Sequence, residues 1–455
     1  LSSAVVRFIS RAVGRSEQHE VRGVFCTSFY LFLVLGLVTA GLTSLLAFFL
    51  KGIVKNPQDL TLFRWLLLIL GFNFAIDFPV RAFNAVFTST IRDDISVGLS
   101  TVKSVIAAAL IYWVVKIGHG VMAVAVVSVG MSLLDDVARV WLAYRLEPAL
   151  SLNPRYIDWA RVKPLFNYSA FTFLARLGDL LQFRVDNLVI TAYIGLAPVT
   201  HFFVASRLVE YLREALAQTI RGMTPIFSQD EGRSDFSAIR RNFMYVTKLC
   251  VYVSVFCCAL SLIYGREFFA RWMGPRYVDA YPVLVVLIAG LVFRLVQLPA
   301  SPLLYGISKH KYYAYSTIAE GILNLVLSIV FVKRYGILGV ALGTAIPMAL
   351  MNVIVQPIYI SYVAGVSWSE YVLHILRHSA TALVVIAVGW AATRPLVEAS
   401  YGALVLCGLI QTVIFVPAVI RLGLTGEERS RLFSVLVQAM PFTNRGTPVL
   451  AGANK

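Results

Sequence analysis

The chain has 455 residues, of which 58% are apolar and only 14% are charged, whereas soluble domains average about 45–50% apolar and about 25% charged residues. This composition, with a mean hydropathy of +0.76, excludes an ordinary soluble enzyme. The net charge is +16. Because the basic residues flank apolar runs, as they do on the cytoplasmic side of membrane proteins, this charge favours a membrane protein over a nucleic-acid-binding one.

Apolar runs long enough to cross a bilayer, which takes about 20 residues, recur along the whole chain. The runs at 24–50, 335–369 and 399–420 contain no charged residue and no histidine. A porin-type barrel would instead show short segments of alternating polarity. The five cysteines lie inside apolar runs without zinc-site spacing, so they indicate buried packing. The sequence therefore predicts an all-α, polytopic membrane protein.

The elements are predicted in chain order as one partial span and twelve full spans. The partial span covers residues 1–13, and the full spans lie near 24–50, 64–90, 97–116, 119–143, 165–195, 198–227, 243–265, 280–307, 312–332, 336–363, 378–394 and 399–422. This pattern predicts an N-terminal lobe at 1–146, a cytoplasmic connector at 147–164, a C-terminal lobe at 165–364, two further helices at 370–424 and a polar cytoplasmic tail at 425–455.

The distribution of lysine and arginine predicts the orientation. If alternate connectors face opposite sides, 24 of the 40 basic residues lie on one side, 10 on the other and 6 inside spans. The positive-inside rule places the richer side in the cytoplasm. The connectors on that side are 14–22, 92–96, 146–164, 229–241, 309–311 and 370–377.

An internal repeat is visible at a nearly constant offset. The tripeptide Gly14-Arg15-Ser16 returns as Gly232-Arg233-Ser234, and the pair Ser100-Thr101 returns as Ser316-Thr317. A shared offset at matching points of the span order favours duplication, hence two pseudo-symmetric lobes of six helices. The counterpart of the span near 165–195 would begin about 50 residues before Leu1. We therefore expect one further helix to precede Leu1.

Polar and ionisable side chains inside spans are costly in hydrocarbon and usually face the bundle interior or an aqueous cavity. At 100° per residue, two sets each fall within about 80° of one helix face. The first is Asn73, Asp77, Arg81, Asn84 and Thr88, and the second is Arg207, Glu210, Glu214, Gln218 and Arg221. The candidate cavity residues on other spans are Arg176, Asp179, Asp186, Arg294, Gln297, Glu320 and Asn324.

Two qualifications apply to these stripes. On one helix, Arg184 projects about 160° away from Asp186, so the two cannot line one cavity. An alternative interpretation also stays open, in which Arg207 with Glu210 and Arg176 with Asp179 are neutralised intrahelical pairs that serve only assembly.

The sequence contains no Walker A, HExxH or GxSxG motif. An enzyme, a metal site, a cofactor and direct drive by ATP are therefore not expected. A carrier driven by an ion or substrate gradient, a channel and a scaffold remain.

A family resemblance enters with the segment Arg184-Val185-Asp186-Asn187-Leu188-Val189-Ile190-Thr191-Ala192-Tyr193-Ile194-Gly195, followed by Ala205-Ser206-Arg207-Leu208. It resembles the RxDxxxIxxxxG…AxRL signature of bacterial polysaccharide flippases, the Wzx-type members of the multidrug/oligosaccharidyl-lipid/polysaccharide (MOP) exporter superfamily. Residues 1–7 also resemble the start of that family's second helix. The likeness extends over most of the chain.

This resemblance implies a fourteen-helix fold in two lobes that moves lipid-pyrophosphate-linked sugars across the bacterial inner membrane by alternating access. The implied partners are a polyprenyl-pyrophosphate-linked oligosaccharide, membrane lipid and the polysaccharide polymerase or synthesis machinery, without nucleic acid. Guanidinium groups donate paired hydrogen bonds to phosphate oxygens. We therefore take Arg81, Arg184, Arg207 and Arg294 as candidate pyrophosphate ligands, and Glu210 and Glu320 as candidate ion- or proton-coupling carboxylates.

Three other functions remain as alternatives. A cation-coupled drug or metabolite exporter of the same superfamily would favour an aromatic, acidic cavity with few arginines, which this sequence does not show. A non-transporting membrane scaffold would not need long polar faces on several helices. An enzyme of lipid-sugar synthesis would need a catalytic motif in a long cytoplasmic loop, and no such motif is present.

Overall fold

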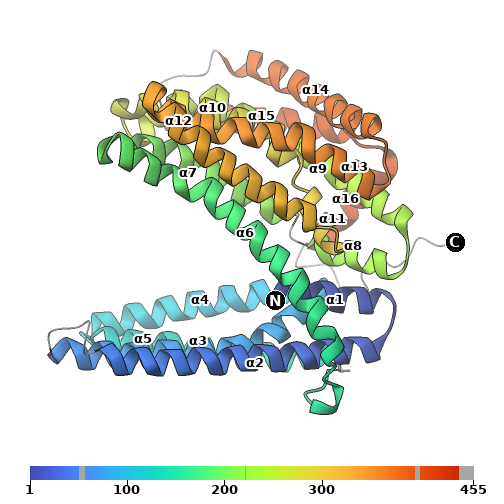
Figure 1. Ribbon diagram of the computed structural model, residues 1–455. Helices are drawn as coiled ribbons and strands as arrows, with labels where there is room; N and C mark the ends of the chain where they lie inside the picture. Colours follow the sequence, from blue (N-terminus) through green and yellow to red (C-terminus); the bar gives the residue numbers. More distant parts are fainter. Residues whose placement is uncertain (51–56, 149, 221, 395–399, 440–455) are drawn as a thin grey trace. The chain divides into compact units, whose positions relative to one another are not determined.

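The computed structural model describes residues 1–50, 57–148, 150–220, 222–394 and 400–439 (Figure 1). Within these ranges the chain is helical and contains no strand, as the sequence predicts. The α-helices are α1 (Ser2–Gly14), α2 (Gln18–Phe49), α3 (Pro57–Ser89), α4 (Asp93–Lys116), α5 (Val121–Leu146), α6 (Trp159–Tyr193), α7 (Leu196–Thr219), α8 (Met223–Gly232), α9 (Phe236–Trp272), α10 (Tyr281–Val296), α11 (Ala300–Gly306), α12 (Lys311–Leu350), α13 (Gln356–Ala364), α14 (Trp368–Thr393), α15 (Tyr401–Ala418) and α16 (Gly426–Ala439). Short 3₁₀ turns lie at Pro154–Tyr156 (η2) and Pro275–Ala280 (η3), and π-turns at Met351–Val355 (η4) and Val419–Gly423 (η6).

Nine helical segments of the described chain are long and apolar enough to cross a membrane. One of them, Lys311–Ala364, has 54 residues, more than twice the length that one crossing needs. It bends at Gly336, whose φ of 58° only glycine adopts at little cost. Helices α6 and α7 have 35 and 24 residues but are not among the nine, because charged side chains interrupt their apolar sequence.

The chain folds into two compact units. Unit 1 comprises Leu1–Phe183, Ala217–Arg241 and Pro299–Ile322, and unit 2 comprises Arg184–Leu216, Asn242–Leu298 and Leu323–Lys455. These bounds differ from those of the predicted lobes, 1–146 and 165–364, because residues 165–183, 217–241 and 299–322 of the predicted second lobe pack with the N-terminal helices. The lobe assignment itself stays a prediction.

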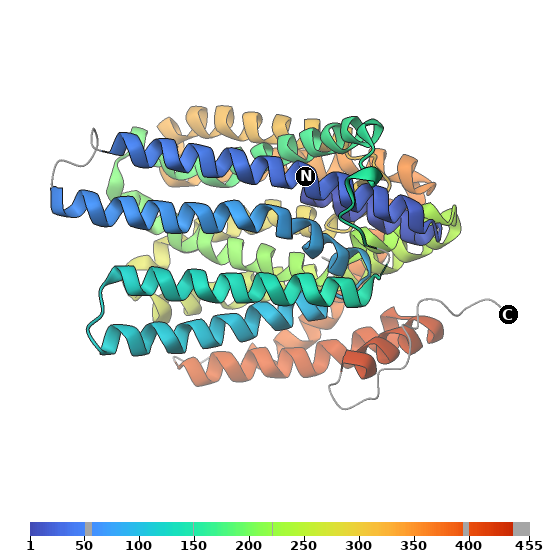
Figure 2. The ribbon, with the colours of Figure 1, turned by 90° about the horizontal axis from the view of Figure 1, so that it is seen from below.

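In unit 1, helices α2, α3, α4 and α5 lie side by side in both views (Figures 1 and 2). Their core centres on Phe25, Phe83 and Phe87, which are at most 3% exposed. The outward faces carry apolar side chains such as Leu37 and Val105, at 65% exposure each. Apolar groups outside as well as inside are what a helix bundle in lipid requires.

In unit 2, a second core joins α9, α10, α14 and α15 around Val251, Ala382 and Phe415. Buried hydrogen bonds tie α14 to its neighbours. The Tyr371 hydroxyl donates to Gln297 Oε1 at 2.6 Å, and the Tyr252 hydroxyl lies 2.7 Å from His378 Nδ1. Gln297, expected to line a cavity, is thus a contact between α10 and α14.

The repeat reappears in the backbone of unit 1. Helices α1 and α8 are each followed, two residues beyond their last residue, by a serine at positive φ, Ser16 at 59° and Ser234 at 58°. Three hydrogen bonds close each helix end between residues that correspond at an offset of 218, for example Arg15 N to Arg11 O and Arg233 N to Gln229 O. Identical helix ends at the repeat offset are what a duplicated sequence produces.

Candidate substrate and ion sites

The polar stripe on α3 is paired within unit 1. The Arg81 guanidinium donates to Asp77 Oδ2 from Nε at 3.0 Å and from Nη2 at 2.9 Å, and it lies 4.7 Å from the ring centre of Phe78. Both side chains are about one third exposed. Asn73 keeps a buried Oδ1 without a hydrogen-bond partner in the described part of the chain. Arg81 therefore has one carboxylate partner and remains accessible to a second anion.

Arg139, which the sequence analysis does not name as a site residue, is a buried polar centre of unit 1. It is 6% exposed, and it donates to Asp135 Oδ2, Asn84 Oδ1 and the hydroxyls of Ser96 and Ser100 at 2.7–3.0 Å. Asn84 is thus occupied by a structural contact. The Asp135 and Arg139 pair at i and i+4 was the signal that could have revealed this residue.

The polar residues of α6 point in different directions. Gln182 is fully buried and hydrogen-bonds through Nε2 to Glu320 Oε1 on α12, and Glu320 is itself 1% exposed. Arg176 is exposed and Asp179 half-buried. Arg184 is 65% exposed at its side chain, whereas Asp186 is 6% exposed. The opposite orientation of these last two agrees with their angular separation on the helix.

Two arginines of unit 2 share one carboxylate. Glu210 on α7 accepts from Arg207 Nη1 at 2.5 Å and from Arg184 Nη2 at 3.3 Å. Arg207 also lies over the ring of Tyr211 at 4.7 Å. The pair of Arg207 with Glu210 that the alternative interpretation expects is therefore present, but the second arginine leaves an excess of positive charge. Glu214 and Gln218 of the same stripe are exposed, and Arg221 lies outside the described residues.

A buried oxygen cluster in unit 2 surrounds Asp186. Thr344 Oγ1 lies 2.9 Å from Asp186 Oδ2, 3.3 Å from Asn324 Oδ1 and 3.1 Å from the backbone oxygen of Val340. Ser328 Oγ is 2.9 Å from the same Asn324 oxygen. Because a hydroxyl carries one proton, Thr344 can satisfy only one of its three acceptors at a time. Thr344 therefore shares its proton among three acceptors, while the Asn324 side chain also hydrogen-bonds to Asp186.

The remaining candidate, Arg294 on α10, is half-buried and engaged with a partner. Arg81 belongs to unit 1, whereas Arg184, Arg207 and Arg294 belong to unit 2. Their convergence on a single cavity stays a prediction. No group of three or more His, Cys, Asp or Glu side chains in the described ranges is placed to hold a metal ion.

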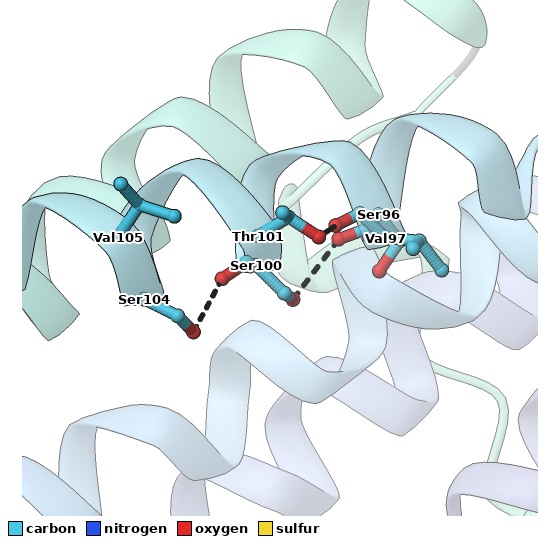
Figure 3. Close-up of a pocket in the computed structure, with 6 residues that line it drawn as sticks. All are labelled: Ser96, Val97, Ser100, Thr101, Ser104 and Val105. Carbon is cyan, nitrogen blue, oxygen red and sulfur yellow. Dashed lines mark hydrogen bonds between the residues drawn. The ribbon is translucent and has the colours of Figure 1, made fainter. Parts of the chain in front are cut away.

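A shallow pocket of about 440 Å³ lies on α4 and contains none of the predicted site residues (Figure 3). Its lining is Ser96, Val97, Ser100, Thr101, Ser104 and Val105. The hydroxyls of Ser100 and Ser104 donate to backbone oxygens one turn earlier on the same helix, at 3.0 and 2.7 Å. A groove on one helix whose hydroxyls are already bonded offers little to a charged ligand.

Solved structures share this fold. A multidrug resistance MATE family transporter of the MOP superfamily, in an outward-facing conformation, matches with a TM-score of 0.67 and 16% identity over 80% of this chain and 84% of its own. A MOP superfamily transporter from Pyrococcus furiosus, described as having a binding pocket of reverse polarity, matches with a TM-score of 0.64 at 15% identity and the same coverage. The fold is therefore that of MOP superfamily transporters.

Sequence relatives agree with this class. A protein of Shigella flexneri named as an O-antigen transporter is 22% identical over 79% of this chain and 84% of its own length. The membrane protein EpsK of Bacillus subtilis is 24% identical over 80% of this chain and 73% of its own length. A Haloferax volcanii protein named as a low-salt glycan biosynthesis flippase is 22% identical over 49% and 47%.

Fold and relatives together define a multi-pass membrane protein of the transporter and flippase class, not an enzyme. The family model described as polysaccharide biosynthesis protein matches residues 8–282. The chain belongs to this family.

Proposed function

We propose that this protein flips a lipid-linked oligosaccharide, carried on a polyprenyl pyrophosphate, across a bacterial inner membrane by alternating access. The observation that carries the proposal is the pairing of Arg184 and Arg207 with the single carboxylate of Glu210. These three side chains lie on long helices in a chain of multi-pass membrane fold, and they keep a net positive charge. A pyrophosphate group supplies the additional acceptor oxygens that two guanidinium groups can bind in pairs.

The partial exposure of these groups supports an exchangeable site. Side chains of Arg184 and Arg207 are 65% and 34% exposed, and ion pairs at exposed positions contribute little stability. Glu210 can therefore give up one arginine to a phosphate oxygen at small cost. Arg81, which is one third exposed and forms an ion pair with Asp77, is proposed as a further ligand from unit 1, and Arg294 as one from unit 2.

The oxygen cluster at Asp186 supports a coupling-ion site in place of the expected coupling by Glu210 and Glu320. Glu210 is occupied by two arginines and Glu320 by Gln182. A buried carboxylate among side-chain and backbone oxygens suits a cation or an additional proton. With Asp186 as its single carboxylate, the cluster matches a monovalent cation better than a divalent one, which usually takes more charged oxygen ligands.

The test of the proposal is substrate movement in liposomes that contain the purified full chain and a fluorescent polyprenyl-pyrophosphate-linked oligosaccharide. We expect Arg207→Ala to reduce the initial flipping rate by about a hundredfold, since a lost charge-assisted bidentate contact is worth about 1.5–3 kcal/mol. Arg207→Lys should recover part of the rate, because lysine keeps the charge without the planar fork.

The matched control is Arg334→Ala, which removes an exposed arginine of α12. The double variant Arg207→Gln/Glu210→Gln separates ligand binding from simple charge neutralisation. If that double variant flips the substrate at the rate of the unaltered protein while Arg207→Gln alone does not, Arg207 only neutralises Glu210 and the pyrophosphate assignment is wrong. Full activity of Arg207→Ala would show that Arg207 is not a pyrophosphate ligand, whereas absence of flipping by the unaltered protein would favour the drug-exporter or scaffold alternatives.

A further inference from the structure

A second pair of arginines, on α1 in unit 1, also shares one carboxylate, but this group is buried. Arg7 Nη2 lies 3.2 Å and Arg11 Nε 2.9 Å from Glu231 Oε2 on α8. Arg7 is only 2% exposed. Neither arginine belongs to the polar stripes of the predicted site.

Arg7 retains unused hydrogen-bonding capacity. Its Nε and Nη1 atoms are buried and have no hydrogen-bond partner in the described part of the chain. A buried donor without an acceptor costs about 1–3 kcal/mol, and more on a charged group. Two guanidinium groups against one carboxylate also leave a net charge of +1. Such a site is short of one anion, and Arg7 has two unused donor atoms to offer it.

The neighbouring titratable groups do not supply that anion. His310 Nε2 lies 3.1 Å from the backbone oxygen of Tyr168, and the Tyr168 hydroxyl donates to the backbone oxygen of Tyr305. Burial, with the nearby Arg7 charge, lowers the pKa of His310 below its ordinary value, so this imidazole stays neutral near pH 7. The Tyr168 hydroxyl is a hydrogen-bond donor here and carries no negative charge. Glu231 is thus the anion that holds Arg7.

Glu231 reaches Arg7 only because α1 and α8 pack backbone against backbone. A Cβ on Gly14 would overlap the backbone oxygen of Gln229, and a Cβ on Gly232 would overlap that of Arg11. The two glycines are the corresponding residues of the sequence repeat. Any movement that separates α1 from α8 withdraws Glu231 and leaves Arg7 and Arg11 without an anion.

We propose that Arg7 and Arg11 form a second anion site, which binds the phosphate groups of a diphosphate-bearing ligand when α8 moves away, and that Glu231 occupies and closes this site in the present structure. The inference rests on the proposed function for the identity of the ligand as the lipid-linked substrate. Connectors 14–22 and 229–241 are predicted to be cytoplasmic, so the site would lie at the leaflet where such a substrate is collected. Glu231 and a phosphate group cannot both bind Arg7 and Arg11. The contact between α1 and α8 therefore cannot close while the phosphates remain bound.

The experiment measures binding of inorganic pyrophosphate to the full chain in detergent, in an Arg184→Gln/Arg207→Gln background that removes the other site. We expect Glu231→Gln to raise the affinity by about tenfold or more, since it removes an internal competitor. Asp235→Asn, which removes an exposed carboxylate just beyond the end of α8, is the matched control and should leave the affinity unchanged. Equal affinity for Glu231→Gln and the control would overturn the proposal.

A second variant protects the test from misfolding. Arg7→Gln/Glu231→Gln leaves neither charge buried alone, so it should fold, and we expect it to lose the affinity gained by Glu231→Gln. Retained affinity in this double variant contradicts the role of Arg7. Thermal shifts in nanodiscs then compare polyprenyl pyrophosphate with inorganic pyrophosphate. A larger shift with the lipid identifies the substrate as the ligand, whereas a shift with inorganic pyrophosphate alone contradicts that assignment.

Failure of this inference and failure of the proposed function give different results. If Arg207→Ala stops flipping but Glu231→Gln binds pyrophosphate no better than the control, the second site is wrong and the function stands. If Glu231→Gln binds pyrophosphate more tightly but flipping is unaffected by Arg207→Ala, the site stands and the proposed substrate path is wrong.

Discussion

Single arginines of this protein differ in how tightly their partners hold them. Arg139 and Asp135 are both 7% exposed at the side chain, and breaking a buried pair typically costs about 3–5 kcal/mol. Arg207 and Glu210 are 34% and 17% exposed, where pairs are weaker and exchangeable. Burial therefore separates arginines that hold helices together from arginines that can bind a ligand. Helical angles alone do not separate the two kinds.

The oxygen cluster around Asp186 leads to a prediction on ion coupling. Asp186→Asn removes the only carboxylate among the oxygens that surround Thr344. We expect the dependence of the flipping rate on an imposed sodium or proton gradient to fall by about tenfold or more, because a neutral amide attracts a cation far less. The measurement is the initial rate in liposomes with and without each gradient.

The control for this variant is Asp279→Asn, an exposed carboxylate of η3 that pairs with His201 at 2.8 Å. It should leave the gradient dependence intact. A gradient dependence that survives Asp186→Asn at its full size would show that coupling resides elsewhere, with Glu320 as the next carboxylate to test.

At the scale of elements, the contact between α1 and α8 depends on the absence of side chains at two repeated positions. Gly14→Ala or Gly232→Ala places a methyl group against a backbone oxygen of the other helix. We expect either change to lower stability by about 1–3 kcal/mol, measured as a shift of the thermal unfolding midpoint in detergent. Gly130→Ala on α5, where a Cβ meets open space, should instead be neutral or stabilise by about 0.5–1 kcal/mol. Equal effects of all three changes would contradict close packing at α1 and α8.

Helix α16 provides a prediction on pH. Glu428 accepts from Lys248 Nζ at 2.8 and 2.9 Å and from the Thr425 backbone N–H at 2.8 Å. Burial by itself raises the pKa of Glu428, but these hydrogen bonds outweigh it and hold the pKa below its ordinary value. The stabilisation is therefore present above the ordinary glutamate pKa, about 4.3, and is lost as the pH falls through the lowered value.

Glu428→Gln reproduces the protonated state at neutral pH. We expect proteolysis of the α16 segment to be several-fold faster in this variant, because the helix loses both its contact with α9 and its N-terminal capping contact. Glu427→Gln, which neutralises the exposed neighbouring carboxylate, should be cleaved at the rate of the unaltered protein. Faster cleavage in both variants would mean that the charge of α16, not its contact with Lys248, sets the rate.

At the scale of the whole molecule, the charge asymmetry predicts the orientation in the membrane. Asp235 and Lys309 are exposed and lie in connectors predicted to be cytoplasmic, whereas Asp279 is exposed in a connector predicted to face outside. A cysteine at position 279 should react with a membrane-impermeant reagent in intact cells, and cysteines at 235 and 309 only after permeabilisation. Four of the five native thiols are buried, so the background is low. Labelling of 235 or 309 in intact cells would reverse the orientation.

The amino-acid sequence by itself determined the class of the molecule. Apolar length, the excess of basic residues, the repeat of Gly14-Arg15-Ser16 and the signature around Arg184 are local or periodic features, and they led to the membrane fold and the polysaccharide flippase family. Each of these features depends on residues that are close in sequence or separated by a constant number of positions. Helical periodicity also predicted correctly that Arg184 and Asp186 point in opposite directions.

Only the tertiary structure decided which partner each polar residue takes. Gln182 meets Glu320 across 138 positions, and Asp186 meets Thr344 across 158. The polar faces found from helical angles predict neither that Arg139 is a packing centre nor that Arg7 and Arg11 share Glu231. The reason is that angular position on one helix does not determine which helix packs against it. Such pairings arise when elements far apart in sequence are brought together, and the side-chain burial that separates structural from ligand-binding arginines is set at that stage.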